Sequence, residues 1–99
     1  MMPGGLTEAK PATPKVQEIA EEVKSQLEQR TNRTYPTFKA VEYKTQVVAG
    51  LIYYIKVYVS EEEYIHLKVF QSLPNEKQPL DLMAFQAGKT RDDALTFFD

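Results

Sequence analysis

The sequence predicts an α+β fold in which one long helix packs on a four- to five-stranded antiparallel β-sheet. Three observations support this fold class. A single apolar stripe at helical spacing lies between residues 14 and 30, several runs after residue 39 alternate with a period of two, and the connections between those runs are short. A lone amphipathic helix cannot bury its stripe by itself, whereas the apolar face of a twisted sheet can cover it.

The chain of 99 residues is short enough for one domain, which we expect to span residues 1–99. Residues 1–12 contain two prolines and two glycines and show no periodicity, so they are predicted to form an extended N-terminal arm. We expect a fifth strand, if present, to come from residues 5–9 of this arm.

The helix is predicted to begin at Pro14, a residue that suits the first helical position, with Thr13 as its N-cap. The apolar stripe ends near Arg30, which gives a helix of about 17 residues at the spacing i, i+3, i+4, i+7 and i+11. The residues of the stripe are Val16, Ile19, Ala20, Val23 and Leu27.

The rest of the chain is predicted to form strands joined as antiparallel hairpins. Alternating patterns begin at Lys39, run from Leu51 to Val59 and from Tyr64 to Phe70, and start again at Leu80. Four polar residues at 60–63 are predicted to form the tip of the second hairpin.

Composition excludes several classes of function. The absence of cysteine rules out disulfides, thiolate zinc sites and cysteine nucleophiles. Twelve Lys and Arg residues against 14 Asp and Glu residues leave no basic field for nucleic acid. Nothing resembles a targeting segment, and no run approaches the roughly 20 apolar residues of a membrane span. We therefore expect a cytoplasmic protein that binds neither nucleic acid nor a membrane.

The residues that could carry chemistry favour neither an enzyme nor a metal site. His66 is the only histidine, it alternates with Ile65 and Leu67, and no ligand or nucleophile lies at a suitable offset, so we interpret it as a residue on the sheet surface. Three consecutive carboxylates at 61–63 point in different directions and are interpreted as a solvated turn. We expect no catalytic residue, no metal and no cofactor, and a hydrolase that uses His66 is the least supported alternative.

The first hairpin carries a different signal, because its turn is apolar. Residues 46–52 contain one polar side chain, Gln46, and Gly50 interrupts the run where the chain must reverse. An apolar turn that faces water is a candidate contact site. The start of the arm and the pair Leu73-Pro74 are also apolar, and the first and third hairpins of a meander reverse at the same end. These three elements are predicted to form one wedge.

The turn Gln46-Val47-Val48-Ala49-Gly50 matches the QVVAG signature of the cystatins, and the chain resembles the stefins, their intracellular, single-domain, disulfide-free branch. Further matches lie in the same order along nearly the full length. They are Pro3-Gly4-Gly5, Lys10-Pro11-Ala12-Thr13-Pro14, Ala40-Val41-Glu42-Tyr43-Lys44-Thr45, Tyr54-Ile55-Lys56-Val57, His66-Leu67-Lys68-Val69-Phe70 and Ser72-Leu73-Pro74.

This resemblance implies a cystatin-like fold and a reversible, tight-binding inhibitor of papain-like cysteine proteases such as the lysosomal cathepsins. It also implies that the wedge occludes the active-site cleft, with Met2 in an apolar specificity pocket and Gly4 turning the arm away from the catalytic cysteine. The implied protease-binding residues are Met2, Pro3, Gly4 and Gly5 of the arm, Gln46, Val47, Val48, Ala49 and Gly50 of the first hairpin, and Leu73 and Pro74 of the second binding loop.

One departure from the stefin pattern leaves an alternative open. Relatives commonly place a polar pair after the signature, whereas this chain has Leu51-Ile52. The alternative function is a stefin-derived binding scaffold directed at a different protein partner. We expect a monomer, and the apolar pair next to the turn makes a domain-swapped dimer the alternative state.

Overall fold

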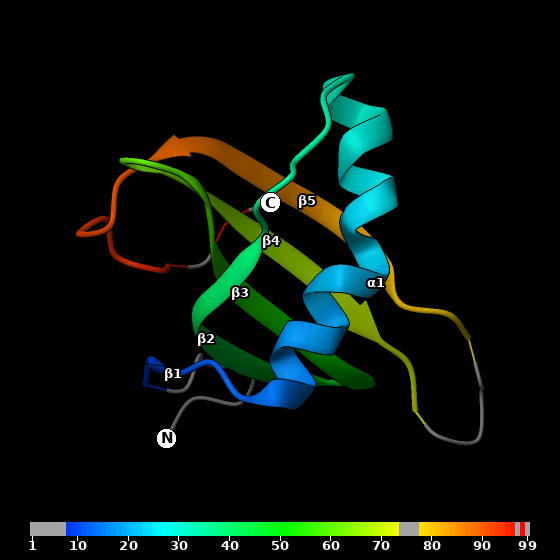
Figure 1. Ribbon diagram of the computed structural model, residues 1–99. Coiled ribbons are helices and arrows are strands. Elements are labelled where there is room, and N and C mark those ends of the chain that lie inside the picture. Colours follow the sequence, from blue (N-terminus) through cyan, green and yellow to red (C-terminus); the bar gives the residue numbers. More distant parts are fainter. Residues whose placement is uncertain (1–7, 74–77, 97, 99) are drawn as a thin grey trace.

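The computed structural model describes residues 8–73, 78–96 and 98. Five strands form one antiparallel sheet in the order β1-β2-β3-β4-β5, and a single long helix, α1, crosses one face of it (Figure 1). This arrangement confirms the predicted α+β class. The elements are β1 (Lys10–Pro11), α1 (Pro14–Thr31), β2 (Lys39–Val48), β3 (Gly50–Ser60), β4 (Glu63–Gln71) and β5 (Asp81–Lys89).

The helix begins at the predicted cap and buries the predicted stripe. The Thr13 hydroxyl accepts a hydrogen bond from the backbone N–H of Val16 at 3.2 Å, and Pro14 opens the first turn. The helix ends at Thr31, and the C-cap residue Asn32, in the left-handed conformation with φ of 55°, donates its backbone N–H to the carbonyl of Glu28. All five residues of the stripe are buried against the sheet: Val16, Ile19, Ala20, Val23 and Leu27.

The fifth strand comes from the N-terminal arm, but it does not include Glu8 or Ala9 of the predicted range. Residues 5–7 lie outside the described residues, and the strand consists of Lys10 and Pro11, which pair with Tyr43 and Glu42. Proline is tolerated here because β1 is an edge strand and needs no second partner for its backbone nitrogen. The chain passes from β1 into α1 within two residues, so β1 fixes where the helix starts relative to β2.

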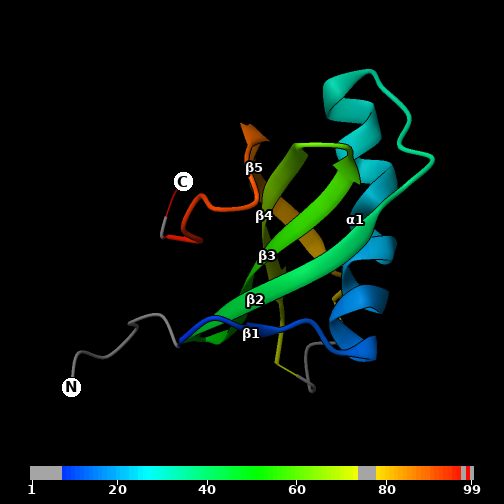
Figure 2. The ribbon, with the colours of Figure 1, turned by 60° about the vertical axis from the view of Figure 1, so that its left-hand side comes forward.

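A second layer covers the sheet face opposite α1, which the sequence analysis did not predict. The C-terminal segment, residues 90–96 and 98, folds back over this face (Figure 2). Its buried side chains Leu95 and Phe98 pack against Ile52 and Tyr54 of β3. Because of this cover, His66 is only 1% exposed, and the prediction that it lies on the sheet surface is wrong.

A row of polar side chains crosses the sheet beneath the C-terminal segment. Glu42, Lys56 and His66 are direct cross-strand neighbours in β2, β3 and β4. The buried Lys56 ammonium donates to the backbone carbonyls of Arg91 and Asp93, each at 2.7 Å, and it lies 3.1 Å from a carboxylate oxygen of Glu42. Lys56 therefore ties the C-terminal segment to the middle of the sheet.

His66 is held neutral in this row. Within the described part of the chain, its Nε2 atom has no hydrogen-bond partner. Burial, together with the positive charges of Lys56 and Lys89, lowers the pKa of His66 from 6.5 to about 4, against the raising effect of Asp93 and Glu42. An uncharged imidazole is the state that this buried position accommodates.

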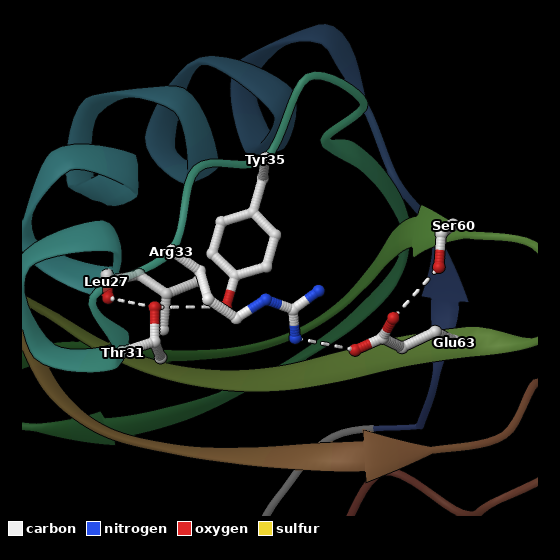
Figure 3. A network of polar contacts seen from close by, with 6 residues as sticks. All are labelled: Leu27, Thr31, Arg33, Tyr35, Ser60 and Glu63. Atoms are coloured by element: carbon white, nitrogen blue, oxygen red, sulfur yellow. Dashed lines mark hydrogen bonds and ion pairs between the residues drawn. The ribbon is translucent and has the colours of Figure 1, made fainter.

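A network of polar contacts links the end of α1 to the β3–β4 turn (Figure 3). The Arg33 guanidinium, just after α1, donates to Glu63 at 3.1 Å, and the Ser60 hydroxyl donates to the other oxygen of Glu63 at 2.9 Å. The Tyr35 hydroxyl donates to Thr31 at 3.1 Å. This region contains the polar tip predicted at residues 60–63. No helix within residues 8–73, 78–96 and 98 is long and apolar enough to cross a membrane.

Candidate functional site

The β2–β3 turn reverses the chain over a single unpaired residue. Val48 pairs directly with Gly50, which leaves Ala49 alone at the tip. Gly50 has φ of 125°, a conformation that residues with side chains rarely adopt. A Cβ atom at this position would lie 2.6 Å from the backbone oxygen of Gln71 and 2.9 Å from the Phe70 ring. The turn therefore requires glycine, and its shape is fixed against β4.

The apolar side chains of this turn point into solvent. Val47 is 70% exposed and Val48 is 41% exposed, and Ala49 at the tip is exposed as well. The exposed parts of these side chains add little to the stability of the fold, and their transfer to an apolar surface would be favourable by roughly 25 cal/mol per Å². The turn thus presents surface that a partner could bury.

Leu73 lies at the same end of the sheet as the turn. It follows β4 by two residues, and Gln71, the last residue of β4, pairs with Leu51 directly behind the turn. Leu73 is 40% exposed. The β2–β3 turn and the end of β4 both lie at the lower side of the sheet in Figure 1. The structure thus brings together the two hairpin elements that the sequence assigned to one wedge.

Five of the predicted binding residues lie outside the described residues. They are Met2, Pro3, Gly4 and Gly5 of the arm and Pro74 of the second loop. The predicted residues that the structure does place are Gln46, Val47, Val48, Ala49 and Gly50 in the β2–β3 turn and Leu73 after β4.

The pair Leu51-Ile52 does not enlarge the exposed apolar surface. Ile52 is 7% exposed and packs in the cluster beneath the C-terminal segment, and Leu51 is half-buried against the core on the α1 side. The pair therefore adds little apolar surface beside the turn. The reason is the second layer: residues on both faces of β3 have apolar neighbours, so two consecutive apolar residues fit there.

Among the described residues, no group of three His, Cys, Asp or Glu side chains could hold a metal ion. Sequence reasoning missed one polar contact of the turn: the Tyr54 hydroxyl donates to the side-chain oxygen of Gln46 at 3.2 Å. Tyr54 reads as an ordinary strand aromatic, and only the pairing of β2 with β3 brings it to Gln46.

Known proteins match this chain along nearly its whole length. The family described as "Cystatin domain" matches residues 4–92. Cystatin-A1 of Sus scrofa is 64% identical over 98 residues, which cover 99% of this chain and 95% of that protein. Cystatin-A of Homo sapiens is 58% identical, with coverage of 99% and 100%.

A third relative carries its activity in its name. Leukocyte cysteine proteinase inhibitor 1 of Sus scrofa is 57% identical over 98 residues, which cover 99% of this chain and 95% of that protein. The family match spans the sheet, the helix and the exposed turn described above. The chain belongs to the cystatin family, in its stefin branch.

Proposed function

We propose that this chain is a reversible, tight-binding inhibitor of papain-like cysteine proteases, the lysosomal cathepsins among them, and that it acts as a monomer in the cytoplasm. Inhibition of cysteine proteases is the function of the cystatin family, and its members are inhibitors rather than enzymes. In this proposal the arm, the β2–β3 turn and the loop after β4 form one wedge that occludes the active-site cleft.

The exposed apolar turn is the observation that carries this proposal. Val47 and Val48 are large, exposed and held by a glycine that fixes the turn, while Leu73 is exposed at the same end of the sheet. A preformed apolar edge loses little conformational entropy when it enters a cleft, so most of the gain from buried surface appears as affinity. Such an inhibitor needs no nucleophile or metal of its own.

The arm and Pro74 complete the wedge in this proposal by resemblance to the stefins. Met2 would occupy an apolar specificity pocket of the protease. Gly4, which has no side chain, would let the arm lie close to the enzyme and turn away from the catalytic cysteine, so that no scissile peptide bond is offered.

The alternative of a binding scaffold for another partner rested on Leu51 and Ile52 as added surface. Within the fold Ile52 is buried and Leu51 is half-buried, as described above. The observations on the described residues therefore favour the protease inhibitor, and they give the alternative no separate support.

Titration of papain with the protein, followed with a fluorogenic peptide, tests the proposal. We expect stoichiometric loss of activity. The variant Val48→Asp should bind at least a hundredfold more weakly, because a carboxylate would lose its hydration in an apolar contact. The matched control Thr34→Asp places the same charge at an exposed position after α1, and it should inhibit like the unchanged protein. Full papain activity at an excess of unchanged protein would reject the proposal.

A further inference from the structure

Side chains that do not belong to the predicted wedge pack beneath the β2–β3 turn. Tyr54 is fully buried, and its hydroxyl donates to the side-chain oxygen of Gln46 at 3.2 Å. The ring of Phe98 meets the Tyr54 ring edge-on, with centroids 5.7 Å apart and planes at 79°. A continuous path of contacts thus runs from the C-terminal segment through Tyr54 to the first residue of the turn.

Phe70 supports the other side of the same turn. A Cβ atom on Gly50 would lie 2.9 Å from one carbon of the Phe70 ring and 3.0 Å from the next, so the ring packs directly against the backbone of Gly50. Phe70 also packs on the buried cluster that contains Ile52, Tyr54 and Leu95. The three exposed residues 47–49 therefore lie between two positions, Gln46 and Gly50, that rest on one cluster.

The base of this cluster is anchored in the middle of the sheet. Lys56 donates to the carbonyls of Arg91 and Asp93, as described above. The turn that starts the C-terminal segment is closed by its own contact, in which the backbone N–H of Thr90 donates to the carboxylate of Asp93 at 2.7 Å. Phe98 is thus brought back over β3 by a segment that is fixed at its beginning.

We infer that Tyr54 and Phe70 are positioning residues for protease binding, and that Phe98 of the C-terminal segment holds them in place. They set the direction of the β2–β3 turn and limit its motion, and Tyr54, which is fully buried, does so without contacting the protease itself. The inference rests on the proposed function, since it assumes that this turn enters the cleft. A turn that is already held in its bound geometry regains little conformational entropy on release. The complex with the protease should therefore dissociate more slowly.

The substitution Tyr54→Phe tests the first path with the least disturbance. It removes one hydroxyl and keeps the ring that Phe98 contacts. We expect dissociation from papain to become about threefold to tenfold faster, with little change in the association rate. Amide hydrogen exchange at residues 47–49 of the free protein should become faster as well, which a change in general stability alone would not confine to the turn.

Tyr58→Phe is the matched control. Tyr58 lies toward the other end of the same strand, and its ring packs against the ring of Tyr64 with the two centroids 5.5 Å apart. This variant should bind papain with the dissociation rate of the unchanged protein, and exchange at residues 47–49 should not change.

Phe98→Ala tests the contribution of the C-terminal segment, and Phe98→Leu tests its rescue. The alanine variant should dissociate faster and exchange faster at the turn, and leucine, which refills part of the cluster, should restore both quantities in part. The dissociation and exchange measurements are to be made only after far-UV circular dichroism has established that each variant is folded under the same conditions.

The outcomes separate this inference from the proposed function. If the unchanged protein leaves papain active, the proposed function fails. If the unchanged protein inhibits papain but Tyr54→Phe dissociates no faster than Tyr58→Phe, or leaves exchange at residues 47–49 unaltered, the positioning role is overturned.

Discussion

The two hairpin turns at opposite ends of β3 use the same backbone device for different surfaces. Each contains a residue with positive φ: Gly50 at 125° in the β2–β3 turn and Glu62 at 59° in the β3–β4 turn. The β3–β4 turn is polar, and Ser60 and Arg33 both donate to its Glu63. The β2–β3 turn instead exposes consecutive aliphatic side chains.

This difference separates what the fold needs from what a partner needs. The polar turn is complete within the molecule, because its carboxylate is hydrogen-bonded by neighbouring residues. The apolar turn is not, since Val47 and Val48 remain in contact with water although the sheet could form with polar residues at both positions. We therefore expect substitutions of the exposed aliphatic side chains in the apolar turn to weaken inhibition, and substitutions in the polar turn to change stability alone.

The largest effect is expected for Gly50→Ala. Alanine must adopt φ of 125° and place its Cβ 2.6 Å from the Gln71 carbonyl oxygen, so the turn and β4 must move apart. Backbone strain and the close contact together should lower the free energy of unfolding by about 4 kcal/mol. Guanidinium unfolding measures this loss, and papain titration should show inhibition weakened at least tenfold.

A comparison variant at the neighbouring residue serves as the control for the Gly50 experiment. The comparison variant Ala49→Gly changes the tip without a steric conflict and should remain stable within about 1 kcal/mol. If Gly50→Ala keeps the stability and the inhibition of the unchanged protein, the turn is not fixed against β4 as the geometry indicates.

The second largest effect is expected in the pH dependence of stability, and it comes from His66 in the middle of the sheet, between the two turns. His66 has a pKa of about 4 in the folded protein and an ordinary value of 6.5 when exposed. The unfolded chain therefore takes up the proton first as the pH falls, so the stability is complete above pH 6.5 and is lost progressively toward pH 4. At about 1.4 kcal/mol per pKa unit, the loss amounts to about 3 kcal/mol.

Urea unfolding between pH 7 and pH 4 measures this loss. The variant His66→Gln has no imidazole to titrate, so its stability should depend less steeply on pH between 6.5 and 4. A pH dependence that is identical in both proteins would show that His66 is not the group responsible. Lys56, Lys89, Asp93 and Glu42 face the imidazole, and they are present in both proteins, so the difference isolates His66.

Periodicity predicted the elements that pack on the α1 side. The helical stripe and the alternating runs are both produced by burial of one face against one partner, so the α1 core could be located by spacing alone. The position of the apolar turn was also predictable, because Gly50 interrupts the apolar run at the point where the chain must reverse between two alternating strands.

The C-terminal segment could not be predicted in the same way. Its anchors are backbone carbonyls of Arg91 and Asp93, which exist at every position of a chain and leave no pattern in the sequence. Its apolar contacts come from Leu95 and Phe98, too few for a period. The burial of His66 and the support of Gln46 by Tyr54 both follow from contacts between distant residues, which explains why the sequence analysis missed them.

A smaller effect, of opposite sign, is expected in the β3–β4 turn. Glu62 adopts the left-handed region, which disfavours residues with a Cβ atom by roughly 1 kcal/mol. Glu62→Gly should remove this strain and raise the free energy of unfolding by up to about 1 kcal/mol, while papain inhibition stays unchanged. Lower stability of the glycine variant in thermal unfolding would contradict this account.

The smallest effect is expected for Arg33→Ala at the polar end. Its guanidinium donates to Glu63 at 3.1 Å, and this contact raises the pKa of Arg33 and lowers the pKa of Glu63. Both side chains are substantially in contact with water, where such pairs are screened and contribute little. The midpoint of thermal unfolding should fall by about 3 °C or less.

Inhibition of papain by Arg33→Ala should equal that of the unchanged protein, because the ion pair lies at the end of β3 opposite the wedge. The same measurement at 0.5 M salt sharpens the test, since screening should remove most of the difference in midpoint between the two proteins. A weaker inhibitor with an unchanged midpoint would place part of the protease contact at the polar end, and the functional division between the two turns would no longer hold.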